Sequence, residues 1–351
     1  MLIVMIINNN TIKSLILCAL LFILTSCQQK THTVSTHQLY VFGTLVEINV
    51  WHDNPEHVRL AIDEISDTFG LMHHQWHAWK PGRLHEINQS LRSGKSVALY
   101  PEEANFIQQT IYQSKLSEHL FNPVMGELID LWGFHADEYP LLTPPPAMQS
   151  ITHLLDEHLT VDVLSLDGLN LSSSNPRVWL DYGGIAKGYA VDRAIRILNQ
   201  HDINNAIVNA GGDLRSIGSK GRSPWRIAIQ SPTNWSMVAE IEVNQDEAIF
   251  TSGNYQRYKE FDGKRYSHII DPRTGMPVNQ IVSATVIADS GIAADAAATA
   301  LVVAGSEQWQ NTAKQMGIKQ ALIINENDVC FATKDMISRL EQLSIVCESI
   351  E

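Results

Sequence analysis

Residues 267–277 read Ser-His-Ile-Ile-Asp-Pro-Arg-Thr-Gly-Met-Pro, which joins a histidine to an apolar pair and a turn containing proline and glycine. A residue before proline is biased toward extended backbone, so Asp271 should stand where a strand ends, and Gly275 should close the turn. His268 would therefore lie on a short strand that runs into a stiff loop. This stretch alone is equally compatible with a hairpin that carries a surface histidine.

The segments around this stretch predict an α+β protein. Alternating apolar residues indicate strands, apolar residues at helical spacing indicate helices, and Asp262-Gly263 is a strong hairpin signal. We expect mostly antiparallel sheets with flanking helices around a cleft. The expected strands include 39–50 (broken by Gly43-Thr44), 159–163, 169–171, 178–181, 225–230, 238–243 and 283–288, and the expected helices include 55–70, 101–119 and 291–301.

Length and composition indicate a globular protein. Of 351 residues, 44% are hydrophobic and 18% are charged, which supports a sizeable core and excludes a disordered chain. The formal net charge of −13 disfavours a nucleic-acid partner. An anionic ligand would need local help from backbone amides, a few cations or a metal ion.

The N-terminal residues predict an exported lipoprotein. Lys13 precedes an apolar run at 15–24 that suits a signal peptide better than a membrane-spanning helix. Leu-Thr-Ser-Cys at 24–27 resembles the bacterial lipobox, so Cys27 would carry lipid. We expect a signal peptide at 1–26, a polar tether at 27–38 and a folded domain at 39–351; a plain signal peptide or an uncleaved anchor is the alternative.

The chain has four cysteines. Cys18 lies in the predicted signal peptide and Cys27 would be lipidated. Cys330 and Cys347 could pair in an oxidising compartment or stay as two buried thiols, and the sequence leaves both possibilities open.

A second informative stretch reads Asp-Tyr-Gly-Gly-Ile-Ala-Lys-Gly-Tyr-Ala-Val-Asp at 181–192. An apolar strand would end at Asp181, and a helix would start after the double glycine with Lys187 in its first turn. Free backbone amides at a helix N-terminus bind phosphate well. The glycine spacing fits neither a P-loop nor the dinucleotide fingerprint, so an ordinary strand-to-helix turn is the alternative.

The alanine-rich helix predicted at 291–301 carries Asp295 and Thr299, which are four residues apart and share one helix face. A carboxylate and a hydroxyl suit a hard cation such as magnesium, which completes its shell with water and phosphate. Alternatively, the helix dipole favours Asp295 in the first turn and Thr299 only packs.

Residues 72–82 contain three histidines and two tryptophans. They lack the acidic or cysteine partners and the regular spacing of a metal site. Trp79 is better suited to stacking against an aromatic ligand.

Together these segments resemble the ApbE-type FAD:protein FMN transferases, a family of periplasmic flavin transferases. The matching motifs occur in family order, and the His-X-X-Asp-Pro-X-Thr-Gly and Ala-Asp-X-X-X-Thr pair is more specific than either part. The motifs are Phe-Gly-Thr at 42–44, Asp-Tyr-Gly-Gly-Ile-Ala-Lys-Gly-Tyr-Ala-Val-Asp at 181–192, Asn-Ala-Gly-Gly-Asp at 209–213, Thr-Ser-Gly-Asn-Tyr at 251–255, His-Ile-Ile-Asp-Pro-Arg-Thr-Gly at 268–275 and Ala-Asp-Ala-Ala-Ala-Thr at 294–299.

The resemblance implies a transferase with two lobes around a flavin-binding cleft. FAD would be cleaved at its pyrophosphate, FMN would be joined through a phosphoester to a Thr or Ser hydroxyl of an acceptor protein, and AMP would leave. His268 would take the proton from the acceptor hydroxyl. Asp295, Thr299 and the backbone carbonyl near Gly184 would hold Mg²⁺.

The resemblance also implies which residues contact FAD. These are Asp181, Lys187 and the backbone around Ile269 for FAD as a whole, and Phe42, Trp79, Leu120, Phe121 and Asn122 for its flavin or adenine side. The family usually has aspartate at the position of Asn122. Asparagine keeps an accepting oxygen but loses the charge, so a hydrogen bond survives while an electrostatic role does not.

The resemblance places the domain on the periplasmic face of a bacterial membrane, anchored through Cys27, with the inner membrane preferred. The acceptor would be a flavin-bearing subunit of a membrane redox complex. Two alternatives stay open: an FAD pyrophosphatase that uses water instead of the acceptor hydroxyl, and a flavin-binding lipoprotein without catalysis. His268, Asp295 and Thr299 argue against the latter, because a passive binder needs no base beside a metal.

Overall fold

The computed structural model describes residues 34–350, apart from 137, 234–235 and 256. The predicted signal peptide, the predicted lipidation at Cys27 and most of the predicted tether lie outside the described residues. The first strand, β1 (Ser35–Val41), begins inside the range predicted as tether. No helix in the described part of the chain is both long and apolar enough to cross a membrane.

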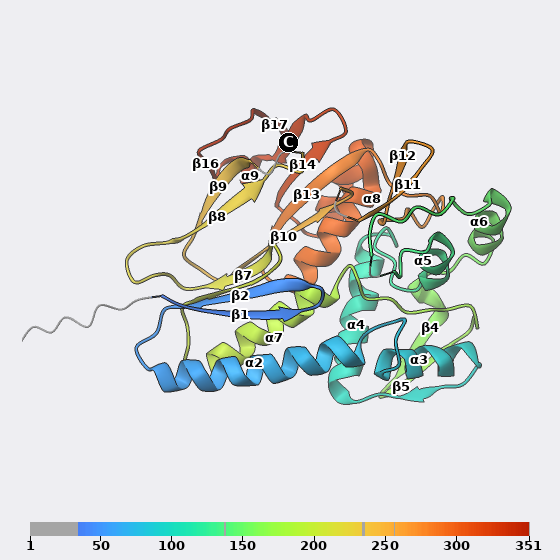
Figure 1. Ribbon diagram of the computed structural model, residues 1–351, viewed down its shortest axis with the longest axis horizontal. Helices are drawn as coiled ribbons and strands as arrows, with labels where there is room; N and C mark the ends of the chain where they lie inside the picture. Colours follow the sequence, from blue (N-terminus) through green and yellow to red (C-terminus); the bar gives the residue numbers. More distant parts are fainter. Residues whose placement is uncertain (1–33, 137, 234–235, 256, 351) are drawn as a thin grey trace, which may run out of the picture. The chain divides into compact units, whose positions relative to one another are not determined.

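Within the described residues, a nine-stranded sheet organises the fold (Figure 1). Its neighbouring strands are antiparallel except for the last pair, which confirms the expected α+β fold with mostly antiparallel sheets. The strands, in order across the sheet, are β1, β2 (Thr44–Val50), β6 (Ala206–Ala210), β7 (Asp213–Ile217), β10 (Glu247–Gly253), β13 (Ile281–Ala288), β14 (Gln320–Asn325), β15 (Cys330–Thr333) and β17 (Cys347–Ile350).

Helices cover one face of this sheet, and a smaller sheet covers the other. Successive residues of β10 point to opposite faces: Phe250 joins the core under the helices, whereas Ile249 joins the core under the smaller sheet. The helices that share the core of Phe250 are α2 (Pro55–Gln75), α3 (Arg83–Arg92), α4 (Pro101–Leu116), α7 (Ala186–Gln200) and α8 (Gly291–Gln315), with a 3₁₀ turn at η1 (Val161–Val163). Helices α5 (Gly126–Trp132) and α6 (Met148–Leu155) belong to a separate apolar cluster, and α9 (Lys334–Ile337) packs in the core of Ile249.

The smaller sheets are short. The one that covers the main sheet contains β8 (Trp225–Gln230), β9 (Met237–Val243) and β16 (Leu340–Glu341). A second contains β3 (Val97–Ala98), β5 (Asn170–Ser173) and β4 (Leu164–Asp167), and the third is the predicted hairpin of β11 (Tyr258–Phe261) and β12 (Lys264–Ser267).

Two strand predictions are wrong. Residues 159–163 end in the 3₁₀ turn η1, which the Thr160 side chain caps by accepting from the Asp162 amide. The run at 178–181 alternates between buried and half-buried residues and forms, within the described part of the chain, only a single bridge, between Trp179 and Met125. The side chain of Asn88 bonds both backbone groups of Leu180, at 2.7 and 2.9 Å. The Asn88 side chain thus satisfies the backbone N–H and C=O of Leu180, which a neighbouring strand would otherwise bond.

Cys330 and Cys347 form a disulfide that joins β15 to β17, with their Cα atoms 4.5 Å apart. This pairing decides between the two possibilities that the sequence leaves open. It attaches the C-terminal strand to the edge of the main sheet.

Helices α7 and α8 approach each other closely where two glycines face. A Cβ atom on Gly188 would overlap the carbonyl of Gly291 and lie 2.9 Å from the Cβ of Asp295. The carboxylate of Asp192, on α7, accepts from the amides of Gly291 and Ile292 at 2.7 and 3.1 Å and so caps α8. This contact sets the first turns of α8 against the start of α7.

We expect Gly188→Ala to lower the free energy of unfolding by about 2 kcal/mol or more, because the added methyl group has no room between the helices. Urea unfolding followed by circular dichroism measures this change. Gly70→Ala in α2 is the matched control: its Cβ position is open, so alanine should stabilise by about 0.5–1 kcal/mol. Equal effects of the two substitutions would contradict the close contact.

Candidate active site

Asp295 lies at the contact between α7 and α8. It is 4% exposed, and its Oδ2 accepts from the Gly188 amide at 2.9 Å. Burial raises the pKa of Asp295, the nearby Asp192 raises it further, and the Lys187 charge and the Gly188 amide oppose the rise. The sequence predicted that free amides at the start of α7 could bind phosphate. One of them, the Gly188 amide, is instead bonded to the Asp295 carboxylate.

Thr299 lies one turn further along α8, on the same face as Asp295. Its Oγ1 is 3.1 Å from Oγ of Ser252, which lies on β10. A Cβ atom on Gly184 would lie 3.2 Å from Thr299 Oγ1, so Gly184 and Thr299 are neighbours. The structure thus gathers the three residues that the sequence predicts as metal ligands.

Oxygen donors at this corner fit a hard cation. Oδ1 of Asp295 makes no hydrogen bond with any residue that the structure describes, so one carboxylate oxygen is free to coordinate. The described residues contain no group of three or more His, Cys, Asp or Glu side chains placed to hold a metal ion. A carboxylate, a hydroxyl and a carbonyl instead suit Mg²⁺, which keeps water and phosphate oxygens in its shell.

Lys187 forms an ion pair with Asp213, at the start of β7. Asp213 is 3% exposed, and its other oxygen accepts from the Thr251 amide at 2.9 Å. Burial lowers the pKa of Lys187, and the charge of Arg257 lowers it further while Asp295 opposes. Asp213 is a site residue that was not predicted from the sequence; its only local signal is an aspartate directly after the double glycine at 211–212.

His268 follows β12 directly and is held by one carbonyl. Its backbone N–H and its Nδ1 each lie 3.1 Å from the carbonyl oxygen of Arg257. Because a carbonyl only accepts, Nδ1 must carry the hydrogen, and Nε2 of the neutral ring keeps its lone pair. Burial, with the charges of Arg257 and Lys187, lowers the pKa of His268 to about 4.

Asp181 and Trp79 are joined by a side-chain hydrogen bond. Trp79 donates its indole N–H to Asp181 Oδ2 at 3.2 Å, and the Gly183 amide donates to Oδ1 at 2.9 Å. Burial raises the pKa of Asp181 against both hydrogen bonds. Trp79 also packs on Trp179, with ring centroids 4.4 Å apart. One ring face of Trp79 is thus already taken by the protein.

The turn at 120–122 is buried. The Phe121 ring lies beside the predicted metal ligands, since one of its ring carbons would lie 3.4 Å from a Cβ on Gly184. Asn122 donates to the Leu159 carbonyl at 2.8 Å and accepts from the Val124 amide at 3.1 Å. An ionised aspartate could not donate to that carbonyl, so the asparagine has a structural reason here.

Phe42 and Ile269 lie at two further turns. Phe42 and Gly43 connect β1 to β2 with left-handed φ angles of 59° and 71°, so the predicted interrupted strand is a hairpin. The Phe42 ring lies 5.3 Å from that of Phe69. The Ile269 amide donates to Ser267 Oγ, and its carbonyl accepts from the Val278 amide. Both backbone groups of Ile269 are therefore already bonded within the chain. The predicted backbone contact of Ile269 with FAD stays a prediction.

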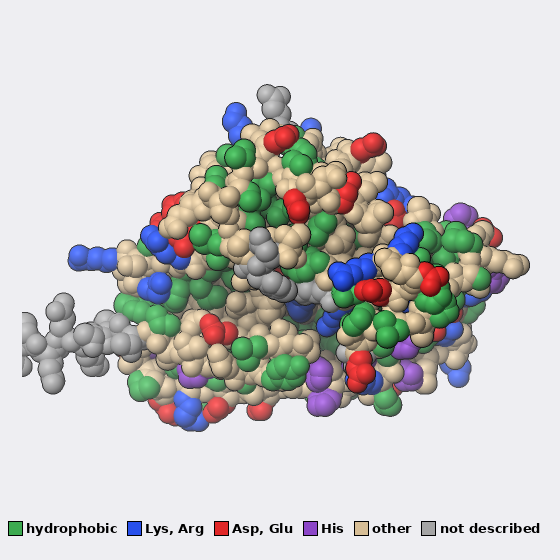
Figure 2. Space-filling view, turned by 45° about the horizontal axis from the view of Figure 1, so that its top comes forward, with side chains coloured by type: hydrophobic (Ala, Val, Ile, Leu, Met, Phe, Trp, Pro, Cys, Tyr) green, Lys and Arg blue, Asp and Glu red, His purple; other side chains and the backbone are tan. Residues whose placement is uncertain are grey.

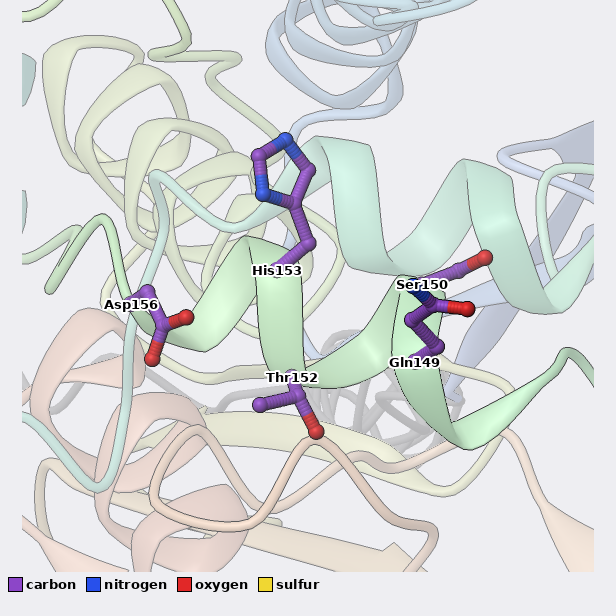
Figure 3. A pocket seen from close by; sticks show the side chains of 5 residues that line it. All are labelled: Gln149, Ser150, Thr152, His153 and Asp156. Atoms are coloured by element: carbon purple, nitrogen blue, oxygen red, sulfur yellow. The ribbon is translucent and has the colours of Figure 1, made fainter.

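A surface hollow lies elsewhere, on α6. Figure 3 shows its lining side chains, which all come from one short segment: Gln149, Ser150, Thr152, His153 and Asp156. None is a predicted site residue. In Figure 2, acidic and basic side chains are interspersed over the visible face without a continuous basic patch, which agrees with the negative net charge.

Comparisons with known proteins identify the family of the chain. The sequence profile of the ApbE family matches residues 42–323. An FAD:protein FMN transferase from Rhodobacter capsulatus is 43% identical over 86% of the chain, and one from Vibrio cholerae is 36% identical over 71%. The matched region spans 57% of the length of the first relative and 74% of the second.

Solved structures share the fold. The ApbE protein from Thermotoga maritima has a TM-score of 0.80, and the flavin transferase ApbE from Vibrio cholerae has one of 0.74. Each is 30% identical and covers 88% of this chain and 100% of its own. Fold and site together define an α+β protein of the ApbE class, with a polar site where α7 meets α8. The chain belongs to the ApbE family.

We expect the His268 imidazole to titrate at about pH 4 rather than at its ordinary 6.5. Because the folded pKa is the lower one, the unfolded chain binds more protons between these values, and this histidine lowers stability as the pH falls through that window. NMR titration of the imidazole signals measures the pKa, and His268→Gln identifies the signal. A midpoint close to 6.5 would contradict the buried, cation-flanked setting.

Proposed function

We propose that this chain transfers FMN from FAD to a Thr or Ser hydroxyl of an acceptor protein, forming a phosphoester and releasing AMP. Family membership and the names of the relatives support flavin transfer. The observation that carries the proposal is the geometry around Lys187, which pairs with Asp213 and whose neighbour Gly188 donates its amide to Asp295. The charge of Lys187 also acts to lower the pKa of His268 and that of Asp295. The base and the predicted metal ligand therefore belong to one site.

The acceptor hydroxyl attacks the phosphorus of the FMN half, and the bond from that phosphorus to the AMP oxygen breaks. Nε2 of His268 takes the hydroxyl proton, because the ring is neutral and this nitrogen has no hydrogen bond with a described residue. The Arg257 carbonyl holds Nδ1–H and so fixes both the tautomer and the ring orientation. The negative charge that the bond cleavage produces leaves on AMP.

Charge balance favours a metal ion at the Asp295 corner. Asp213 already pairs with Lys187, and the two phosphates of FAD would add negative charge beside Asp295. We propose that Asp295 Oδ1, Thr299 Oγ1 and the Gly184 carbonyl hold Mg²⁺. When bound, the ion would neutralise charge on the diphosphate.

The cellular setting is part of the same proposal. A lipid anchor at Cys27 would place the domain at the periplasmic face of a membrane, the inner one preferred. The acceptor would be a flavin-bearing subunit of a membrane redox complex. The lipobox and the family resemblance support this setting.

We expect the purified full-length chain, with FAD and magnesium, to add the mass of FMN to a candidate acceptor domain and to release AMP. Intact-mass spectrometry of the acceptor measures the product. EDTA should stop the reaction, and His268→Ala should abolish transfer while FAD binding persists. Free FMN and AMP without an adduct would favour the pyrophosphatase, and intact FAD despite binding would favour a carrier.

We expect Asp295→Asn to raise the magnesium concentration needed for half-maximal transfer by about tenfold or more, since even outer partners of metal ligands contribute roughly 10- to 100-fold. Asparagine preserves the shape and can still accept from Gly188. Asp289→Asn is the matched control, because Asp289 is exposed just before α8. A magnesium requirement that is the same in both variants would remove Asp295 from the ligand set.

A further inference from the structure

Arg257 lies where three distant segments of the chain meet. A Cβ atom on Gly43, in the β1–β2 turn, would lie 3.7 Å from its Nη2. Its Cζ lies 5.9 Å from the ring centroid of Tyr139, and its carbonyl binds His268. The guanidinium is exposed, so this arginine presents its charge to solvent at the edge of the site.

The Arg257 guanidinium lies on an aromatic ring, that of Tyr139, rather than on an acidic side chain. Among the residues that the structure describes, no carboxylate forms an ion pair with its guanidinium. Lys187 has Asp213 as its partner, and Arg265, on the adjoining hairpin, has Glu260 at 3.3 Å. In a chain with a net charge of −13, an arginine without an acidic partner beside another cation marks a place where an anion is favoured.

The field of Arg257 reaches the reacting groups. Its carbonyl oxygen lies 3.1 Å from Nδ1 of the proposed base His268, which places Arg257 beside the site rather than on a remote surface. Its positive charge also adds to burial in lowering the pKa of both Lys187 and His268. A planar guanidinium can bind two phosphate oxygens through two parallel N–H donors, a fixed geometry that an ammonium group lacks. An anion bound there would also relieve the repulsion between Arg257 and Lys187.

We propose that the Arg257 guanidinium binds the diphosphate of the dinucleotide and stabilises the negative charge that develops on the phosphate of the departing AMP. This inference rests on the proposed function and adds a second cation to it. It also separates two roles within one residue. The carbonyl orients His268, whereas the side chain binds the substrate.

Because the two roles use different atoms, a side-chain substitution tests one of them. Arg257→Gln removes the charge but keeps the carbonyl, and Arg257→Lys keeps the charge. Arg265→Gln is the matched control, since that arginine is exposed on β12 and points to Tyr258. Each variant of the full-length chain is titrated with FAD, with the quenching of flavin fluorescence as the signal, at several salt concentrations.

We expect Arg257→Gln to weaken FAD binding by about 10- to 100-fold, as the loss of a charged hydrogen bond does. Its affinity should also depend less on salt, because one screened attraction is gone. Arg257→Lys should recover part of the affinity, and Arg265→Gln should bind as the unchanged chain does. The rate of transfer at saturating FAD should fall in Arg257→Gln as well.

Wild-type affinity in Arg257→Gln would overturn the inference. So would an Arg257→Lys variant as weak as Arg257→Gln with unaltered salt dependence, because the side chain would then act through shape alone. An unchanged chain that binds FAD through Arg257 but transfers no FMN would overturn the proposed function and keep this inference. Absence of FAD binding by the unchanged chain would overturn both.

Discussion

The buried carboxylate of Asp295 on the Gly188 amide is the interaction on which the site depends. It exists only because two glycines let α7 and α8 approach closely, and because Asp192 caps α8 from α7. This contact removes the carboxylate from water, which raises the pKa of Asp295, and it leaves Oδ1 without a hydrogen bond to any described residue. The same contact brings Lys187 beside it.

Electrostatics bears on how this acidic chain would accept the proposed dinucleotide. The proposed ligand carries negative charge into a site that already holds buried carboxylates. The positive charge of Lys187 does not offset it, because Lys187 already forms an ion pair with Asp213. A metal ion at Asp295 and the guanidinium of Arg257, which pairs with no carboxylate among the described residues, would supply the missing positive charge. Burial, together with the charges of Arg257 and Lys187, lowers the pKa of the proposed base His268 and so keeps its ring neutral. Affinity and base strength thus have a common origin.

The sequence could predict the elements with strong local signals. The hairpin at Asp262-Gly263, the antiparallel pair β8–β9 and the helix at Asp295 have the expected types because turn chemistry and periodicity are local properties. The strand prediction for 178–181 was wrong, because the backbone of this run bonds the Asn88 side chain and the distant loop at 123–124. A pattern cannot show which distant group satisfies a backbone.

For the site, the sequence by itself determined which residue types are present, and their motifs indicated the family. Tertiary structure alone decided that Asp295 takes the α7 amide, that Lys187 pairs with Asp213, and that the Arg257 carbonyl selects the His268 tautomer. These outcomes depend on contacts between residues far apart in the chain. Burial and the field of neighbouring charges arise only once the chain has folded, so no local pattern encodes them.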